Sequence, residues 1–208
     1  MNIVDIGLIA AATLLAIAFR PWSALRTPAL RNPWVAVLVL LPCLWGAQGI
    51  LPTTFPLQLS GACLLVLMFG WPLAVLTLLP IAMAGAWLGG GDLTRAVQLA
   101  AWNGVVPATA ALAIGIATRR WLPKQVFVYI LARGFLGTVL AMSLAGALRV
   151  WWLPRLPGSS AVTLLTAAWL IAWGEAFITG AFTAIFVAFR PEWLLTYSDA
   201  RYLPPPAR

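Results

Sequence analysis

The segment from Gly89 to Pro107 has the sequence GGGDLTRAVQLAAWNGVVP, and the rest of the chain is organised around it. Its three glycines end the apolar run that closes at Leu88, and the next apolar segment contains the amides Gln98 and Asn103. Amides are rare on helix faces that contact lipid. A helix turns by roughly 100° per residue, which places these two amides roughly 140° apart. We therefore expect each amide to face a neighbouring helix or a cavity inside a bundle.

The same segment predicts an interruption of the helix. An amide, a glycine and a proline lie within five positions, at Asn103, Gly104 and Pro107. Together they weaken the helical hydrogen-bond ladder and expose carbonyl groups. The pattern indicates either a break that forms a binding site or a kink that serves packing. Asp92, after the glycines, is either an entrance residue for a cation or a solvent-exposed turn residue.

Composition indicates an integral membrane protein. The chain has 208 residues, of which 62% are hydrophobic and 9% charged, and its mean hydropathy is +0.95. Its apolar runs are long enough to cross about 30 Å of hydrocarbon, and no ten-residue alternation of a barrel strand occurs. We expect one all-α, polytopic domain over residues 1–208, multi-pass in the cytoplasmic (inner) membrane. The 13 basic residues lie beside apolar runs, where they orient helices in the lipid bilayer, so nucleic acid is not an expected partner.

Seven transmembrane helices are expected, followed by a cytoplasmic tail over residues 190–208. Their expected ranges are 3–19, 34–51, 57–69, 72–88, 95–118, 125–148 and 161–189. Nine basic residues then lie in the inner loops and tail and three in the outer loops, which predicts that the N-terminus is outside and the C-terminus inside. The uncharged turn at Gly70-Trp71-Pro72 leaves open whether residues 57–88 form two spans or one broken, re-entrant helix.

Arg133 and Glu175 are the charged residues that lie well inside the expected helices. An isolated charge at the membrane centre costs at least about 2.5–3.5 kcal/mol, so we expect the two to form an intramembrane pair. Such a pair either only holds two helices together or also takes part in gating. The sequence contains no histidine, no catalytic triad and no P-loop. We therefore expect no enzymatic activity and no cofactor.

Residues 55–195 resemble the CbiM/NikM family, the membrane substrate-binding components of energy-coupling-factor transporters for cobalt and nickel. The resemblance is carried by Leu59-Ser60-Gly61-Ala62, Phe69-Gly70-Trp71-Pro72, Gly90-Gly91-Asp92, Asn103-Gly104 and Glu175-Ala176-Phe177-Ile178-Thr179. It implies ATPase subunits and a transmembrane coupling subunit as partners, and a transition-metal cation or a diverged small solute as substrate. The alternative is a non-transporting membrane scaffold or assembly factor.

The family binds its metal through the terminal amine and two histidines, and both histidine positions differ in this chain. Asn2 occupies the first and Gln58 the second. The resemblance implies a substrate pocket between the N-terminus, the third helix and residues 92–103. Its candidate residues are Met1, Asn2, Asp5, Gln58, Asp92 and Asn103. Because amides bind first-row metals less well than imidazoles, we predict that the protein holds no stoichiometric nickel or cobalt.

Overall fold

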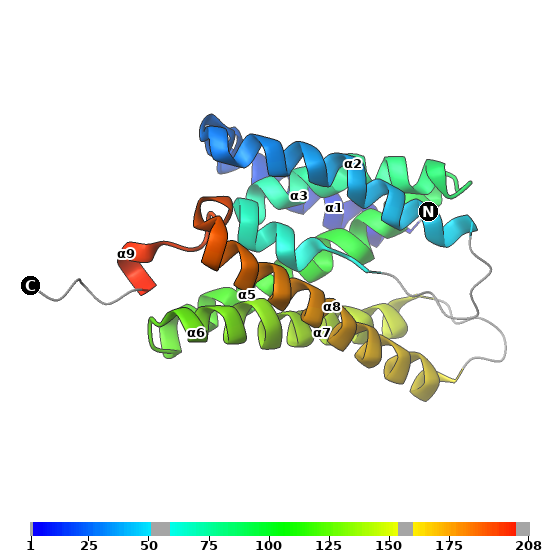
Figure 1. Ribbon diagram of the computed structural model, residues 1–208. Coiled ribbons are helices and arrows are strands. Elements are labelled where there is room, and N and C mark those ends of the chain that lie inside the picture. Colours follow the sequence, from blue (N-terminus) through cyan, green and yellow to red (C-terminus); the bar gives the residue numbers. More distant parts are fainter. Residues whose placement is uncertain (1, 51–58, 154–159, 203–208) are drawn as a thin grey trace, which may run out of the picture.

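The computed structural model describes residues 2–50, 59–153 and 160–202, and these residues form helices joined by turns. The elements are α1 (Ile3–Ala18), η1 (Pro21–Arg26), α2 (Pro28–Ile50), α3 (Ala62–Leu88), α4 (Leu93–Gln98), η2 (Leu99–Val105), α5 (Val106–Trp121), α6 (Val126–Val128), η3 (Tyr129–Phe135), α7 (Leu136–Trp152), α8 (Ala161–Phe189), η4 (Pro191–Trp193) and α9 (Asp199–Tyr202). Figure 1 shows a bundle with the N-terminus and the Gly89 turn toward one end and α9 at the other. The predicted all-α, polytopic architecture is confirmed.

Five helical stretches of the described chain are long and apolar enough to cross a membrane. They are Pro28–Ala47, Ala62–Leu88, Leu93–Trp121, Val126–Trp152 and Ala161–Phe189, and the 16-residue α1 is a shorter apolar helix. Large apolar side chains on α1, α2, α7 and α8 are exposed on the outside of the bundle. A surface of this kind is suited to lipid, and the protein is a multi-pass membrane protein.

The most buried helix, α3, is broken at Gly70, as the Gly70-Trp71-Pro72 pattern predicts. Gly70 has φ 73° and ψ 159°, a backbone conformation that glycine adopts far more readily than other residues. The part before Gly70 runs from the middle of the bundle toward α9, and the part after it runs back to the Gly89 turn (Figure 1). The predicted segments 57–69 and 72–88 are therefore the two parts of α3. The seven predicted ranges thus correspond to α1 and five candidate spans, one of which, α3, is broken at Gly70.

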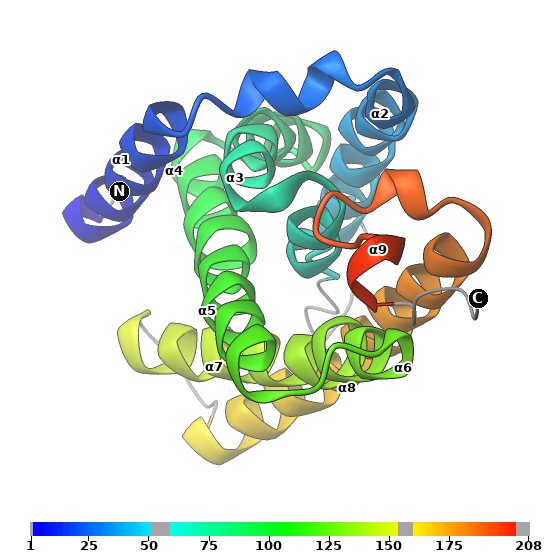
Figure 2. The same cartoon turned by 90° about the vertical axis from the view of Figure 1, so that its left-hand side faces the viewer.

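In the view along the bundle, α3 lies between α1 and α4 on one side and α2 on the other (Figure 2). The starts of two neighbouring helices differ from the predicted ranges. α2 begins at Pro28 instead of Trp34, because proline is compatible with the first turn of a helix, where its missing N–H is not needed. α4 begins at Leu93 instead of Arg95, because Asp92 caps it.

The segment after α8 completes the broken helix. The Leu195 amide donates to the Met68 carbonyl at 2.9 Å, and the Thr196 amide and hydroxyl donate to the Leu67 carbonyl at 3.3 Å and 2.8 Å. In a continuous helix these carbonyls would accept from the amides four residues later, but the break redirects the chain and Pro72 has no N–H. The segment therefore supplies donors that lipid could not provide.

The opposite placement of the two ends makes the orientation testable by cysteine labelling. In a chain whose own Cys43 and Cys63 are replaced by serine and alanine, a cysteine at Leu93 should react with a membrane-impermeant maleimide in intact cells. Cysteines at Thr27 and Lys124 should react only after the membrane is permeabilised. All three residues are exposed in the structure, so access depends on the side of the membrane. Labelling with the opposite pattern would show that the predicted orientation is wrong.

Candidate functional site

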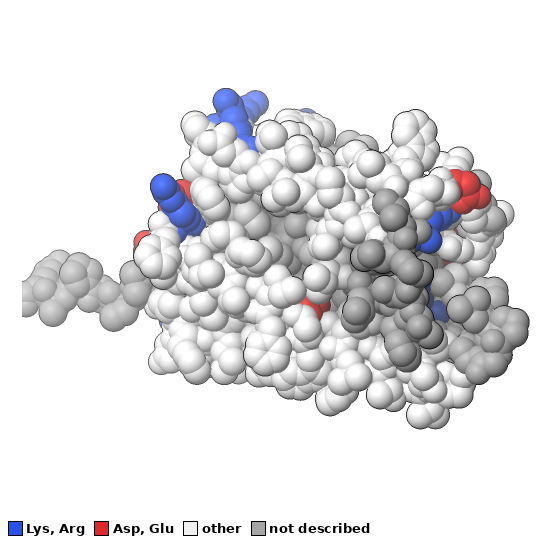
Figure 3. Space-filling view, turned by 45° about the vertical axis from the view of Figure 1, so that its right-hand side comes forward, with Lys and Arg blue, Asp and Glu red and all other residues white. Residues whose placement is uncertain are grey.

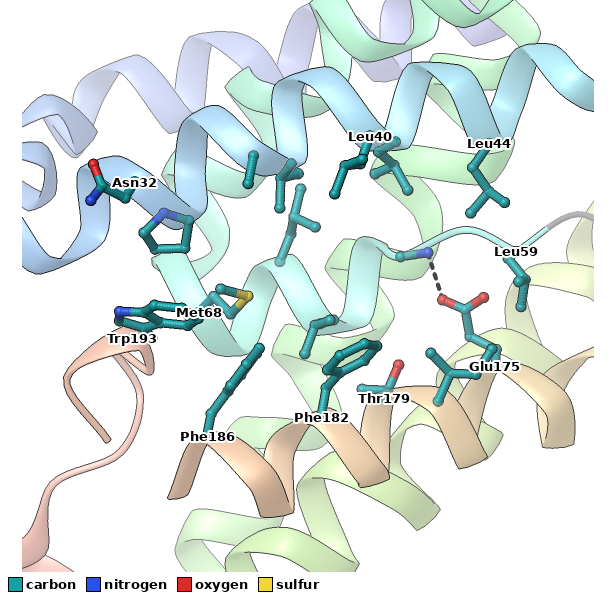
Figure 4. A pocket seen from close by; sticks show the side chains of 18 residues that line it. Asn32, Leu40, Leu44, Leu59, Met68, Glu175, Thr179, Phe182, Phe186 and Trp193 are labelled. Atoms are coloured by element: carbon teal, nitrogen blue, oxygen red, sulfur yellow. Dashed lines mark hydrogen bonds between the residues drawn. The ribbon is translucent and has the colours of Figure 1, made fainter. Parts of the chain in front are cut away.

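The N-terminus of α3 lies inside the bundle, and Glu175 of α8 accepts from the two backbone amides directly before its first residue. The Ser60 amide donates to Glu175 Oε2 at 2.7 Å, and the Gly61 amide donates to Oε1 at 2.6 Å. Figure 4 draws the second of these bonds as a dashed line. A helix start has amides without intrahelical partners and carries the positive end of the helix dipole. A carboxylate is well suited to this position, because both of its oxygens accept. Glu175 therefore binds the chain at the start of a helix that begins within the membrane.

Ser60 joins this helix start to two further helices. Its side chain is fully buried, and its hydroxyl donates to the Asn103 carbonyl at 2.6 Å and accepts from the Ala62 amide at 3.1 Å. The indole N–H of Trp45 on α2 donates to the Ser60 carbonyl at 3.2 Å. Together with the Glu175 contact, these bonds connect α2, α8 and η2 at a single residue. We call Asp5, Ser60, Trp102, Asn103 and Glu175 the polar node.

The remaining part of the polar node is held by the π-helix η2. The interruption predicted around Asn103 takes the form of this wider turn, all seven residues of which are buried. Asn103 lies ten residues after Leu93, or about 15 Å along the helix, near the middle of a bilayer core. Trp102 donates its indole N–H to Asp5 Oδ1 at 3.0 Å. Single π-helical turns frequently occur at functional sites.

Two atoms of the polar node have spare hydrogen-bonding capacity. Asp5 is only 1% exposed, yet its Oδ2 has no hydrogen-bond partner within the described residues, and neither has the Nδ2 of the buried Asn103. A buried polar atom without a partner costs about 1–3 kcal/mol, and more when the group is charged. The Asp5 oxygen can bind a cation or accept a hydrogen bond, whereas the Asn103 Nδ2 group can only donate one. The described residues contain no cluster of three or more histidine, cysteine or acidic side chains that could hold a metal ion.

Other predicted site residues have local structural roles. Asn2 is exposed and caps α1 by accepting from the Val4 amide at 3.4 Å. Asp92 is exposed and caps α4 by accepting from the Arg95 amide at 2.9 Å, and mainly this bond lowers the pKa of Asp92 below its ordinary value. The structure thus supports the turn interpretation of Asp92. The candidates Met1 and Gln58 lie outside the described residues.

The predicted intramembrane pair of Arg133 and Glu175 is not formed, since no ion pair joins them in the described part of the chain. The Arg133 guanidinium lies over the Tyr129 ring, 5.3 Å from its centre. It also passes Gly115, where an added Cβ would lie 2.9 Å from Nη2. The physical reason for the correction is that the start of α3 provides two N–H donors, so Glu175 does not need a cation as its partner.

The structure connects three predicted residues, Asp5, Asn103 and Glu175, through two that the sequence analysis did not nominate. Ser60 precedes a helix start, where serine is a common capping residue, and this pattern could have identified it. Trp102 has an indole N–H that requires a partner when buried, but nothing in the sequence indicates which one. Their long-range partners, 43 to 115 positions away, become visible only in the folded chain.

Comparison with known protein families gives a match that includes every helix of the polar node. The family model of CbiM, described as the cobalt uptake substrate-specific transmembrane region, matches residues 2–193. No curated protein and no solved structure matches the chain. Because the match covers nearly all of the sequence and the structure is a multi-pass helical bundle, the chain belongs to the CbiM family of cobalt uptake substrate-specific transmembrane regions.

Proposed function

We propose that this protein is the substrate-binding membrane subunit of an energy-coupling-factor transporter in the cytoplasmic (inner) membrane, and that it binds a small cation from outside. Membership of a family of cobalt uptake substrate-specific regions supports this role. The sequence contains no nucleotide-binding motif, so energy for transport has to come from another subunit. ATPase subunits and a transmembrane coupling subunit are the partners that the resemblance implies.

The observation that carries the proposal is that the Oδ2 of Asp5 has no hydrogen-bond partner among the described residues. A buried carboxylate is stable only with compensating charge or hydrogen bonds, and within the described part of the chain Asp5 receives one bond, from Trp102. A bound cation would provide the missing partner for this oxygen. Carboxylate and amide oxygens are hard ligands, whereas imidazole and thiolate favour nickel, cobalt and zinc. We therefore propose a cation bound mainly by oxygen, either a weakly held transition metal or a different small cation.

Uptake measurements with a panel of labelled metal ions and small organic cations test this proposal. Cells that express the protein together with candidate ATPase and coupling subunits should accumulate one class of cation. Asp5→Asn should reduce its uptake at least about tenfold, since it removes the charge but retains an acceptor for Trp102. Asp92→Asn is the matched control and should transport normally, because asparagine caps a helix as well as aspartate does.

Two results would contradict the proposal. Uptake by Asp5→Asn at the unmodified rate, with normal protein in the membrane, would exclude Asp5 from substrate binding. A folded protein that accumulates none of the solutes alongside functional partner subunits would favour the alternative of a non-transporting scaffold.

A further inference from the structure

We propose that a groove between α2 and α8 binds one acyl chain of an anionic phospholipid from the cytoplasmic leaflet. The groove has a volume of about 480 Å³ and opens at the side of the bundle. α2 and α8 form its walls, and the first part of α3 forms its floor (Figure 4). It is separate from Asp5 and Asn103, and the proposal does not depend on the identity of the substrate.

The chemistry of the walls fits a hydrocarbon chain. The lining is almost entirely apolar and includes Val37, Leu40, Leu44, Leu64, Phe182 and Phe186. The one acidic group in the lining, Glu175, is already bound by two backbone amides. It lies at the end of the groove opposite Asn32 and Trp193 (Figure 4). An occupant would therefore be held by apolar contact, without hydrogen bonds along most of its length.

The length of the groove fits a single acyl chain. The groove extends along α2 from Asn32 to Leu44, twelve residues or about 18 Å. This length is close to the ~15 Å of hydrocarbon in one leaflet. An acyl chain of one leaflet matches this length, and its hydrocarbon fits a lining of apolar side chains.

Charge at the end toward α9 explains why the lipid should be anionic. Arg31 precedes the lining residue Asn32, and Arg190 lies between the lining residues Phe186 and Trp193. The Arg190 side chain is 63% exposed, and its contact with Glu192 is long, at 3.5 Å. Figure 3 shows the hollow in a largely uncharged face, with basic and acidic side chains at the α9 end and also at the opposite end. Arginines at a membrane surface attract acidic headgroups, and indole rings favour the same depth.

Photo-crosslinking identifies the occupant directly. A benzophenone amino acid at Leu40, inside the groove, is compared with one at Leu140, an equally lipid-accessible position on α7. After irradiation in native membranes, adducts at Leu40 should be enriched in anionic phospholipid at least about fivefold relative to the bulk lipid. Adducts at Leu140 should reflect the bulk composition. The same composition at both positions, or a protein adduct at Leu40, would overturn the proposal.

A stability measurement tests the charge argument independently. Phosphatidylglycerol added to purified protein in detergent should raise the thermal midpoint more than phosphatidylcholine with the same acyl chains. The double variant Arg31→Gln, Arg190→Gln should lose this difference. The control Arg119→Gln, Arg120→Gln, which neutralises two exposed arginines outside the groove lining, should retain it. If both double variants behave alike, the arginines at the groove do not select the lipid.

Discussion

Replacing Glu175 with alanine is expected to reduce the free energy of unfolding by about 3–6 kcal/mol, enough to remove most of the folded protein from the membrane. The carboxylate accepts from the amides of Ser60 and Gly61, and each charge-assisted bond contributes about 1.5–3 kcal/mol. No water is available at this depth to replace the lost acceptors. Size-exclusion chromatography of a fluorescent fusion in mild detergent, with a thermal unfolding series, measures the loss.

Two further variants show how Glu175 acts. Glu175→Gln should lose about half as much stability, because its side-chain amide has one oxygen acceptor and turns an N–H group toward the second backbone amide. Combining Arg133→Ala with Glu175→Ala should not restore folded protein, because Arg133 contacts the Tyr129 ring and makes no ion pair with Glu175 in the described structure. Partial rescue by the arginine replacement would show that the two charges are paired after all.

The purified protein is expected to contain no stoichiometric nickel or cobalt, and the paired change Asn2→His, Gln58→His should raise its affinity for these ions on the order of 100-fold. Two imidazoles would restore the ligand types that the family uses with the terminal amine. The affinity tag therefore belongs at the C-terminus, so that the amine stays free. Elemental analysis of the purified protein and calorimetric titration with each ion measure the outcome.

A matched control separates a designed site from a general effect of histidine. Asn32 and Gln125 are exposed amides near the α9 end of the bundle, and the pair Asn32→His, Gln125→His should leave nickel and cobalt affinity unchanged. An increase in both double variants would mean that any added histidines bind the ions. A tightly held metal in the unmodified protein would show that its amide and oxygen ligands suffice, and Asp5 would then be the first residue to replace.

Much of the fold could be predicted from local pattern. Runs of apolar residues determine which segments lie in the membrane, because backbone groups in hydrocarbon must bond within a helix. The break in α3 was visible in the sequence, since Gly70 permits a positive φ and Pro72 cannot continue the hydrogen-bond ladder. The interruption around Asn103 was visible for a similar reason.

Helix ends could be predicted less well, because alternatives of similar energy exist at each end. The start of α2 at Pro28 depends on a proline that is compatible with either a loop or a first helical turn. The docking of Leu195 and Thr196 onto the carbonyls of α3 connects positions more than 120 residues apart. The local periodicity of the sequence cannot indicate a contact between residues so far apart in the chain.

The sequence by itself determined that Asp5, Asn103 and Glu175 are unusual, because polar groups are costly within the membrane and need partners. It did not determine which partners they have. The rule that a buried charge pairs with an opposite charge led to Arg133, yet the two bonds to Glu175 come from backbone amides at the start of α3. Every residue except proline has a backbone N–H, so the identities of Ser60 and Gly61 carry little information about this role. Only the tertiary structure, by starting a helix inside the bundle, left those amides without other acceptors and placed them against Glu175.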